Sequence, residues 1–353
     1  MQCKMRTLQE SIDLWLVNQN PDEWIYLHEI EDSIVKNIPE NVRGLEINNC
    51  KNLVSVENLP SLSTLVIKKC SINSIILPHS LRHLRLYCTN IGFINIPPHL
   101  RILQIHDSKE LYLSNIPSDL IELTLINIDI DTLPELPEGL VSLDLEGCRI
   151  KNMPRLYDNL LYLDLSKTSI DHLDYLPYFL EELHICHTII NRLPELPDTL
   201  EVLNCSMSML NEIPRLPPNL KELYCSSMPF LKKIPELPHG ATVLSAYMNE
   251  HITSIPQLPL TLKELYINNT GIVLLHNLPD SIETIEMYEC PNLIIQGIIG
   301  ESVASYNKRC REFLMDKAIS ACKMIKEELL HLTWGEYIIH YVKKYGQEAL
   351  ELL

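Results

Sequence analysis

The sequence predicts an α/β repeat solenoid whose strands form one parallel β-sheet. The main observation is a Leu or Ile that begins a triplet of the L-x-(L/I/C) type and recurs thirteen times, at intervals of 19 to 21 residues. A fixed period of about twenty residues is typical of stacked structural repeats. Prolines at fixed places in the repeat and helix-forming sequence at both ends support this fold class. The recurring residues are Leu45, Leu65, Leu84, Leu103, Leu123, Leu143, Leu163, Leu183, Leu203, Leu223, Leu244, Leu265 and Ile285.

Each repeat contains a short predicted strand, which is clearest in residues 140–146. Apolar and polar residues alternate there, so the strand has one buried face and one outward face. Leu143 and Leu145 belong to the buried face, whereas Asp144 and Glu146 belong to the outward face. The outward faces of successive strands therefore build a continuous surface.

A small residue follows each strand at a turn position, where we expect its side chain to bond neighbouring backbone as the coils stack. Cys205 and Cys225 instead occupy the buried strand position. Cysteine thus serves as a small apolar residue, without a C-x-x-C pair, which predicts a reducing compartment. The turn residues are Cys50, Cys70, Thr89, Ser108, Cys148, Thr168, Thr188, Asn249, Thr270 and Cys290.

The segment that returns to the next strand carries two prolines three residues apart, as in residues 133–137. Proline fixes φ and removes a hydrogen-bond donor, so this side of the repeat is not a helix and favours an extended, polyproline II conformation. About twenty residues are also too few for a strand, two turns and a helix. The same pattern recurs at residues 193–197, 213–217, 234–238 and 255–259.

The complete unit, L-P-x-x-L-x-x-L-x-(L/I/C)-x-x-(N/C/T)-x-(L/I)-x-x-(L/I)-P-x, resembles the leucine-rich repeat. It is most similar to the short "LPX" subtype of the YopM and IpaH families of bacterial type III-secreted effectors, and similar repeats occur in proteins of giant viruses. The resemblance implies a horseshoe with a concave parallel sheet and helical caps at both ends. We expect an N-terminal cap at 1–23, a solenoid of about 13 to 14 repeats at 24–296, and a C-terminal cap or tail at 297–353.

The N-terminal segment has the spacing of one helix face at Leu8, Ile12, Trp15 and Leu16. Residues 24–34 allow either a helix or a degenerate first strand. The repeat period favours the strand, because it places residues 25–27 one repeat before Leu45.

The C-terminal segment has no proline after Pro291 and predicts two helices. The first, at about 302–332, has an apolar stripe, and the second follows a capping box at residues 333–336. Their interpretation as a cap over the last coil competes with a partner-binding tail, and with disorder or oligomerisation. The first stripe is Leu314, Ala318, Ala321, Ile325, Leu329 and Leu332, and the second is Trp334, Tyr337, Ile338, Tyr341, Val342 and Tyr345.

The net charge of −17 belongs entirely to residues 1–300, because residues 301–353 hold eight basic and eight acidic side chains. An acidic solenoid is poorly suited to nucleic acid or anionic membranes, so we expect neither as a partner. It suits a basic protein partner, although solubility alone also accounts for it. No run of eighteen apolar residues and no signal-peptide core occurs, which predicts a cytoplasmic protein.

Known catalytic motifs are missing from the sequence, and we expect no enzymatic activity, cofactor or metal site. The ligase members of the resembling families carry a large domain with a Cys-x-Asp loop after the repeats. Here about 55 residues follow the repeats, and no Cys-x-Asp occurs; Cys310 and Cys322 precede Arg311 and Lys323. The arrangement of helix, repeats and short tail is more similar to YopM.

Two groups of outward strand residues are candidates for binding a partner. Asp144, Asp164 and His184 occupy one position of three successive strands, where Asp164 and His184 are close enough to hydrogen-bond. With Cys186 and His187 nearby, a nucleophile or metal site is the alternative, but the repeat supplies no oxyanion hole or enclosed pocket.

The second group combines tyrosines with carboxylates on the last four strands. Tyrosine is enriched at protein interfaces, and the natural complement of this group is a basic, partly apolar surface or peptide. Tolerance of tyrosine on an open sheet is the alternative. The residues are Glu222, Tyr224, Tyr247, Glu264, Tyr266, Glu286 and Tyr288.

These observations predict a non-enzymatic scaffold or adaptor that binds a protein partner on its concave face. A pathogen or viral protein acting in host cytoplasm is one form of this hypothesis. The alternatives are a substrate-receptor subunit of a ubiquitin ligase, for which residues 1–24 are too short to hold an F-box-like segment, and a purely structural repeat protein. The partner and the oligomeric state are left open.

Overall fold

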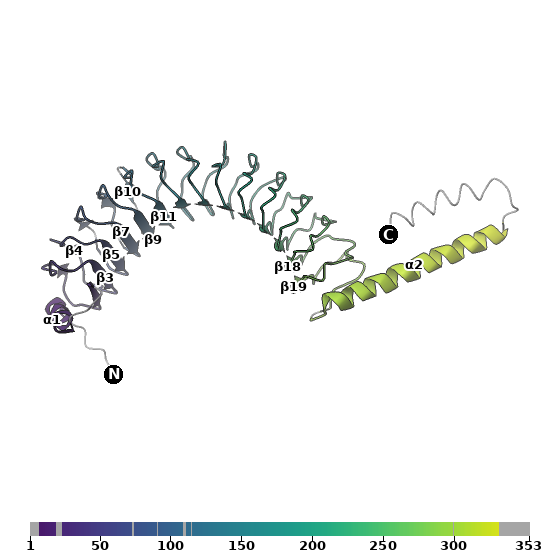
Figure 1. The fold of residues 1–353 in the computed structure, drawn as a ribbon, viewed down its shortest axis with the longest axis horizontal. Coiled ribbons are helices and arrows are strands. Elements are labelled where there is room, and N and C mark those ends of the chain that lie inside the picture. Colours follow the sequence, from purple (N-terminus) through teal and green to yellow (C-terminus); the bar gives the residue numbers. More distant parts are fainter. Residues whose placement is uncertain are drawn as a thin grey trace.

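The computed structural model describes residues 7–18, 23–72, 74–89, 91–108, 111–113, 115–298 and 300–331. They form an arc of coils whose inner side is lined by one fourteen-stranded parallel sheet, with a helix at each end (Figure 1). The predicted leucine-rich-repeat horseshoe is confirmed. The sheet strands are β1 (Trp24–His28), β3 (Gly44–Asn48), β5 (Thr64–Lys68), β7 (His83–Tyr87), β9 (Ile102–His106), β11 (Glu122–Ile126), β12 (Ser142–Asp144), β13 (Tyr162–Asp164), β14 (Glu182–His184), β15 (Val202–Asn204), β16 (Glu222–Tyr224), β17 (Val243–Ser245), β18 (Glu264–Tyr266) and β19 (Thr284–Glu286).

The core follows from the repeat period, because residues one period apart pair directly across the sheet. Leu143 of β12 faces Leu163 of β13, which in turn faces Leu183 of β14. All three side chains have no exposed surface. Each coil can bury its leucines only against its neighbours, so stability is shared between adjacent repeats.

The turn residues bond the backbone as predicted, in two different ways. The hydroxyl of Thr168 donates to the carbonyl of Leu165 in its own coil at 2.6 Å. The thiol of Cys148 instead donates to the carbonyl of Leu125 in the preceding coil at 3.1 Å. Such bonds satisfy buried carbonyl groups at these corners of the stack, whereas the hydroxyls of Thr89 and Ser108 bond each other at 3.2 Å.

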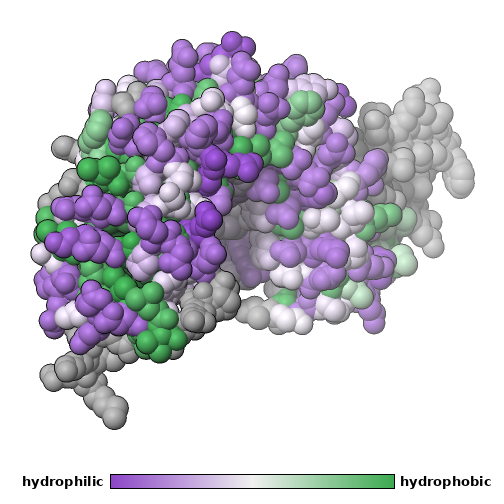
Figure 2. All heavy atoms as spheres, turned by 60° about the vertical axis from the view of Figure 1, so that its left-hand side comes forward, coloured by the Kyte–Doolittle hydropathy of each residue, from purple (hydrophilic) through white to green (hydrophobic). Residues whose placement is uncertain are grey.

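The convex side is extended, as predicted, and residues 23–298 contain no helix where they are described. In the N-terminal coils it forms two-residue parallel strands: β2 (Ile34–Val35), β4 (Ser55–Val56) and β6 (Ser74–Ile75) in one ladder, β8 (Phe93–Ile94) and β10 (Tyr112–Leu113) in another. Figure 2 brings this half forward and shows apolar patches between hydrophilic residues. Exposed apolar side chains here include Val54, Ile76 and Phe93.

The N-terminal helix α1 (Leu8–Asn18) covers the first coil. It begins with a reciprocal cap, in which the Glu10 amide donates to Thr7 Oγ1 at 3.2 Å and the Thr7 amide donates to Glu10 Oε2 at 3.0 Å. Leu8 and Ile12 are buried, but Leu16 is 52% exposed, so its predicted place on the buried face is wrong. The strand interpretation of residues 24–34 is confirmed by β1, which pairs with β3.

The C-terminal helix α2 (Val303–His331) contacts the solenoid only through its first turns and then projects away (Figure 1). Tyr306 and Cys310 are buried, whereas Ala318 of the predicted apolar stripe is exposed. The stripe is therefore not the face that packs on the last coil. The second predicted helix, at Trp334–Tyr345, lies outside the described residues. Neither α1 nor α2, the two helices of the described chain, has the length and apolar character for crossing a membrane.

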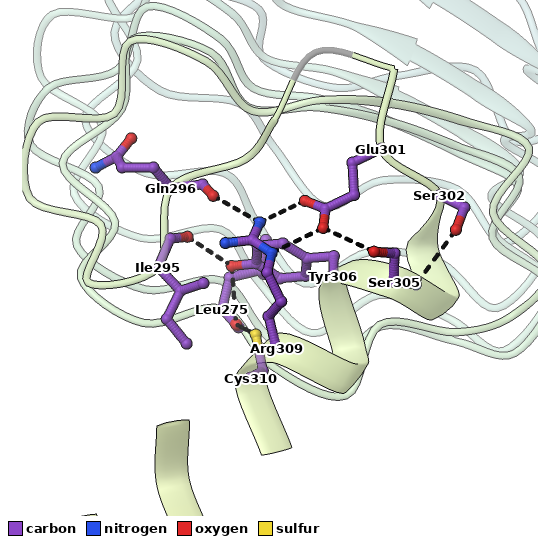
Figure 3. A network of polar contacts seen from close by, with 9 residues as sticks. All are labelled: Leu275, Ile295, Gln296, Glu301, Ser302, Ser305, Tyr306, Arg309 and Cys310. Carbon is purple, nitrogen blue, oxygen red and sulfur yellow. Dashed lines mark hydrogen bonds and ion pairs between the residues drawn. The ribbon is translucent and has the colours of Figure 1, made fainter. Parts of the chain in front are cut away.

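Polar contacts fix the start of α2 on the last coils (Figure 3). The Tyr306 hydroxyl lies 3.2 Å from the carbonyl oxygen of Leu275 and 3.0 Å from that of Ile295. Arg309 Nε donates to Glu301 Oε1 at 2.8 Å, and this contact lowers the pKa of the Glu301 carboxyl. The helix is thus held by specific bonds to backbone that the last coil would otherwise leave unpaired.

Candidate functional site

The concave face presents three columns of side chains, because alternate residues of every strand point away from the core. The outward residues of β12 and the turn after it are Ser142, Asp144 and Glu146. We call the column that contains Ser142 the first, the column of Asp144 the middle, and the column of Glu146 the third. The middle column contains Asp144, Asp164, His184, Tyr224, Tyr266 and Glu286; the first contains Glu222 and Glu264; the third contains Tyr247 and Tyr288.

The Asp–His group is aligned as predicted, since Asp144 pairs with Asp164 and Asp164 with His184. The predicted hydrogen bond between Asp164 and His184 is wrong. Asp164 Oδ1 accepts the amide of Ser166 at 2.7 Å, and His184 Nε2 lies 3.6 Å from Glu182 Oε2. Each side chain thus makes its polar contact within its own strand, and the His184 ring also lies 5.4 Å from the Tyr162 ring of β13, measured between centroids.

Asp144 has the same local geometry, with Oδ1 accepting the Glu146 amide at 3.0 Å. A side chain that binds the amide two residues on makes a turn at the end of the strand. Burial raises the pKa of Asp144 to about 6, and the nearby Asp164 and Glu146 charges add to this rise. The carboxylate is a partly desolvated charge in an acidic setting.

The neighbouring thiol and imidazole do not complete a reactive centre. Burial raises the pKa of the Cys186 thiol above its ordinary value, which opposes formation of a nucleophilic thiolate. His187 is exposed at a turn with a φ of 56°. Within the described residues, no group of three or more His, Cys, Asp or Glu side chains is arranged to hold a metal ion.

The tyrosine group has an order that the sequence analysis did not recognise. Tyr224 donates its hydroxyl to Glu222 Oε2 at 2.8 Å, and Tyr266 donates to Glu264 Oε2 at 2.9 Å. The signal was present as a repeated Glu-x-Tyr, because residues two apart share a face of the strand. Burial, followed by the Glu222 contact, raises the pKa of Tyr224 to about 12, so the phenol remains a donor.

Two of the predicted tyrosines lie beyond the ends of their strands. Tyr247 follows Ser245, the last residue of β17, and is half-buried in the third column. Tyr288 follows β19, is 45% exposed, and places its hydroxyl 3.4 Å from Glu286 Oε2. The four tyrosines share one face of the sheet but occupy two columns of it.

The charge of the concave face changes along the arc. In the three columns of β12–β19 no Lys or Arg accompanies the carboxylates. Lys167, at the edge of the sheet, binds one of them, Glu146, at 2.7 Å. The concave face of β12–β19 is therefore acidic and aromatic. Its carboxylates belong to Asp144, Glu146, Asp164, Glu182, Glu222, Glu264 and Glu286.

The N-terminal half of the concave face has basic and aromatic side chains that the sequence analysis missed. Lys68 Nζ lies 5.9 Å from the ring centroid of Tyr87, and the Tyr87 and His106 rings have centroids 4.6 Å apart. These three residues belong to the third column, and Arg85 lies beside Tyr87 in the middle column. Counting back from β12 by one repeat period at a time predicts that these residues lie on the same face as Asp144.

The repeat length, the concave parallel sheet and the extended convex side define a leucine-rich-repeat solenoid. The structure is similar to that of YopM, a leucine-rich effector protein from Yersinia pestis, with a TM-score of 0.63 and 21% identity over 79% of this chain and 92% of that chain. For YopM from Yersinia enterocolitica the TM-score is 0.54 and the identity 22%, over 79% of this chain and 85% of that chain.

A leucine-rich-repeat protein from Leptospira interrogans is also similar, with a TM-score of 0.50 and 18% identity over 83% of this chain and 93% of that chain. No protein-family model and no curated protein matches the sequence. The predicted resemblance to YopM is therefore confirmed for the fold.

Proposed function

We propose that this chain is a non-enzymatic scaffold or adaptor that binds a protein partner through the concave face of β16–β19. The observation that carries the proposal is the repeated Glu–Tyr pair of Glu222 with Tyr224 and Glu264 with Tyr266. We further propose that it acts in the cytoplasm, with a pathogen or viral protein inside a host cell as the setting that the YopM-like fold favours.

The Glu–Tyr pairs suit binding because their side chains are already oriented. Each hydroxyl is held by its glutamate, so less conformational freedom is lost when a partner covers the ring. The second carboxylate oxygen of each glutamate stays available to accept a Lys or Arg donor. A basic partner with apolar side chains between its charges complements this surface.

We propose no catalytic role for the Asp–His group, because its polar atoms are already engaged. Asp144 and Asp164 each use Oδ1 to accept a backbone amide, and His184 contacts Glu182 rather than a nucleophile. The thiol of Cys186 has a raised pKa. A nucleophile needs a base within hydrogen-bond reach, and this group contains no such pair.

The test is an affinity capture from host-cell lysate with the wild type and a Tyr224→Ala/Tyr266→Ala variant. Tyr178→Ala is the matched control, because Tyr178 is 66% exposed and lies outside the sheet. We expect a protein that the wild type and the control capture and the double variant loses. Capture of the same proteins by all three chains would contradict binding on this face, and circular dichroism establishes that each variant is folded.

A further inference from the structure

Arg85 lies at the centre of β7 on the concave face. Its neighbours in the strand, Leu84 and Leu86, point into the core and have no exposed surface. Across the sheet, the same position is occupied by Val66 of β5 and Gln104 of β9. The guanidinium is therefore set on the open face, three strands before the acidic columns begin at β12.

This guanidinium has no counter-charge among the residues that the structure describes. It makes no hydrogen bond or ion pair with any other described residue, and its Nε atom is buried without an acceptor. The nearby carboxylates are engaged elsewhere, since Glu46 binds Lys68 at 3.0 Å and Glu122 accepts from Gln104. A half-buried, unpaired cation is costly, and in native proteins such a group is ordinarily paired.

The surroundings of Arg85 are electropositive. Burial lowers the pKa of His83 in the same strand, and the positive charges of Arg85 and Arg101 lower it further, against a smaller opposing effect of the Glu122 carboxylate. Lys68 and Tyr87 form the next part of the surface, with the ammonium over the phenol ring. An anion would thus gain from Arg85 directly and from the wider field of this patch.

We propose that the Arg85 region binds an acidic segment of a polypeptide, with a Glu or Asp carboxylate seated on the Arg85 guanidinium. The planar guanidinium matches a carboxylate through two parallel hydrogen bonds. The half-buried ring of Tyr87 provides apolar contact for the residues beside that carboxylate. The chain carries a net charge of −17, which favours a singly charged carboxylate over a polyanion such as nucleic acid.

The first test uses the free protein and the variant Arg85→Gln. Removing an unpaired, half-buried charge is expected to leave the thermal midpoint unchanged or to raise it. A structural role for Arg85 would instead lower the midpoint, and that result would overturn the proposal.

The second test measures binding of a fluorescent synthetic peptide that alternates Glu and Leu, by anisotropy with the full chain. The same peptide with Gln for Glu, and one with phosphoserine for Glu, are compared. We expect Arg85→Gln to weaken binding of the Glu peptide about tenfold to a hundredfold. Arg192→Gln, which removes the same charge from an exposed site outside the sheet, is expected to bind like the wild type.

Equal binding of the Glu and Gln peptides, or equal binding by Arg85→Gln and the wild type, would overturn the proposal. Binding of the phosphoserine peptide alone would overturn the assignment to a carboxylate. The Tyr224→Ala/Tyr266→Ala variant is expected to bind the Glu peptide like the wild type. The two binding surfaces are therefore tested separately.

Discussion

Asn249 joins the backbone of two consecutive coils with one side chain. Its Oδ1 accepts the amide of Met228 at 2.8 Å, and its Nδ2 donates to the carbonyls of Cys225 and Ala246, both at 2.8 Å. The residue is only 1% exposed. These buried groups have no access to water, so the bonds of Asn249 are costly to remove.

We expect Asn249→Ala to lower the free energy of unfolding by about 2–4 kcal/mol, because it leaves buried backbone groups unpaired. Urea-induced unfolding followed by circular dichroism measures this change. Asn219→Ala is the matched control, since Asn219 is exposed and makes one bond to the Asp198 carbonyl. If Asn249→Ala lowered the free energy of unfolding as little as the control does, Asn249 would not stabilise the contact between the two coils.

The sequence predicted small, bonding residues at these turns because they recur at a fixed place in the period. It could not predict which backbone group each one binds. The Thr188 hydroxyl donates to the carbonyl of Ile185, three residues earlier in the same coil. The Cys290 thiol, with its longer C–S bond, donates to the carbonyl of Ile267 in the preceding coil. That choice depends on side-chain length and coil separation, which spacing alone does not encode.

Asp144 gives the concave face a pH dependence. Its folded-state pKa of about 6 lies above the ordinary value of 3.8, so the folded protein binds more protons between these values than the unfolded chain does. By linkage, the contribution of this residue to stability falls as pH rises through that window.

We expect Asp144→Asn to keep the turn, because the amide oxygen still accepts the Glu146 amide, and to remove this pH dependence. The variant should become more stable than the wild type as pH rises from about 4 to above 6, and match it at lower pH. Thermal midpoints across this range measure the difference, with the exposed Asp198→Asn as control. A wild-type-like pH profile in Asp144→Asn would contradict the assignment.

At the scale of elements, α2 shows what a periodic pattern can and cannot predict. The sequence placed the helix correctly, but its most regular apolar stripe is not the docking face. Only the first turns meet the last coil, through Tyr306, Asn307 and Cys310. A helix of 29 residues is about 40 Å long, far longer than the end of one coil, and the spacing of apolar residues carries no information about where contact stops.

Asn307 is the residue that ties α2 to the solenoid most directly. Its Oδ1 accepts the amide of Leu278 at 3.0 Å, and its Nδ2 donates to the Leu278 carbonyl at 2.8 Å. We expect Asn307→Ala to weaken the docking of α2 by about 2–3 kcal/mol, because both groups of Leu278 are buried.

Hydrogen exchange at the Leu278 amide checks this prediction and should become faster in the variant. Lys308→Ala is the control, because Lys308 is exposed and has only a 3.9 Å contact with Glu312. Equal exchange in the two variants would mean that α2 is held by apolar contacts instead.

At the scale of the whole molecule, one sheet carries two surfaces of different chemistry. The fixed period predicted the fold, the sheet register and the alignment of Asp144 with Asp164, because neighbouring coils stack one period apart. The contacts of each side chain were not predictable in the same way. Whether the His184 imidazole contacts the Asp164 or the Glu182 carboxylate depends on side-chain rotamers and on the bond that Asp164 already makes to the backbone.

Partner binding by the acidic and aromatic face of β16–β19 can be tested with a photo-cross-linking residue placed at Tyr266 and exposed to host-cell lysate. The same residue at Tyr178, exposed outside the sheet, is the control. We expect a protein adduct from position 266 that the Glu222→Lys substitution abolishes and that position 178 does not form. Identical adducts from both positions, or none from position 266, would contradict partner binding on the concave face.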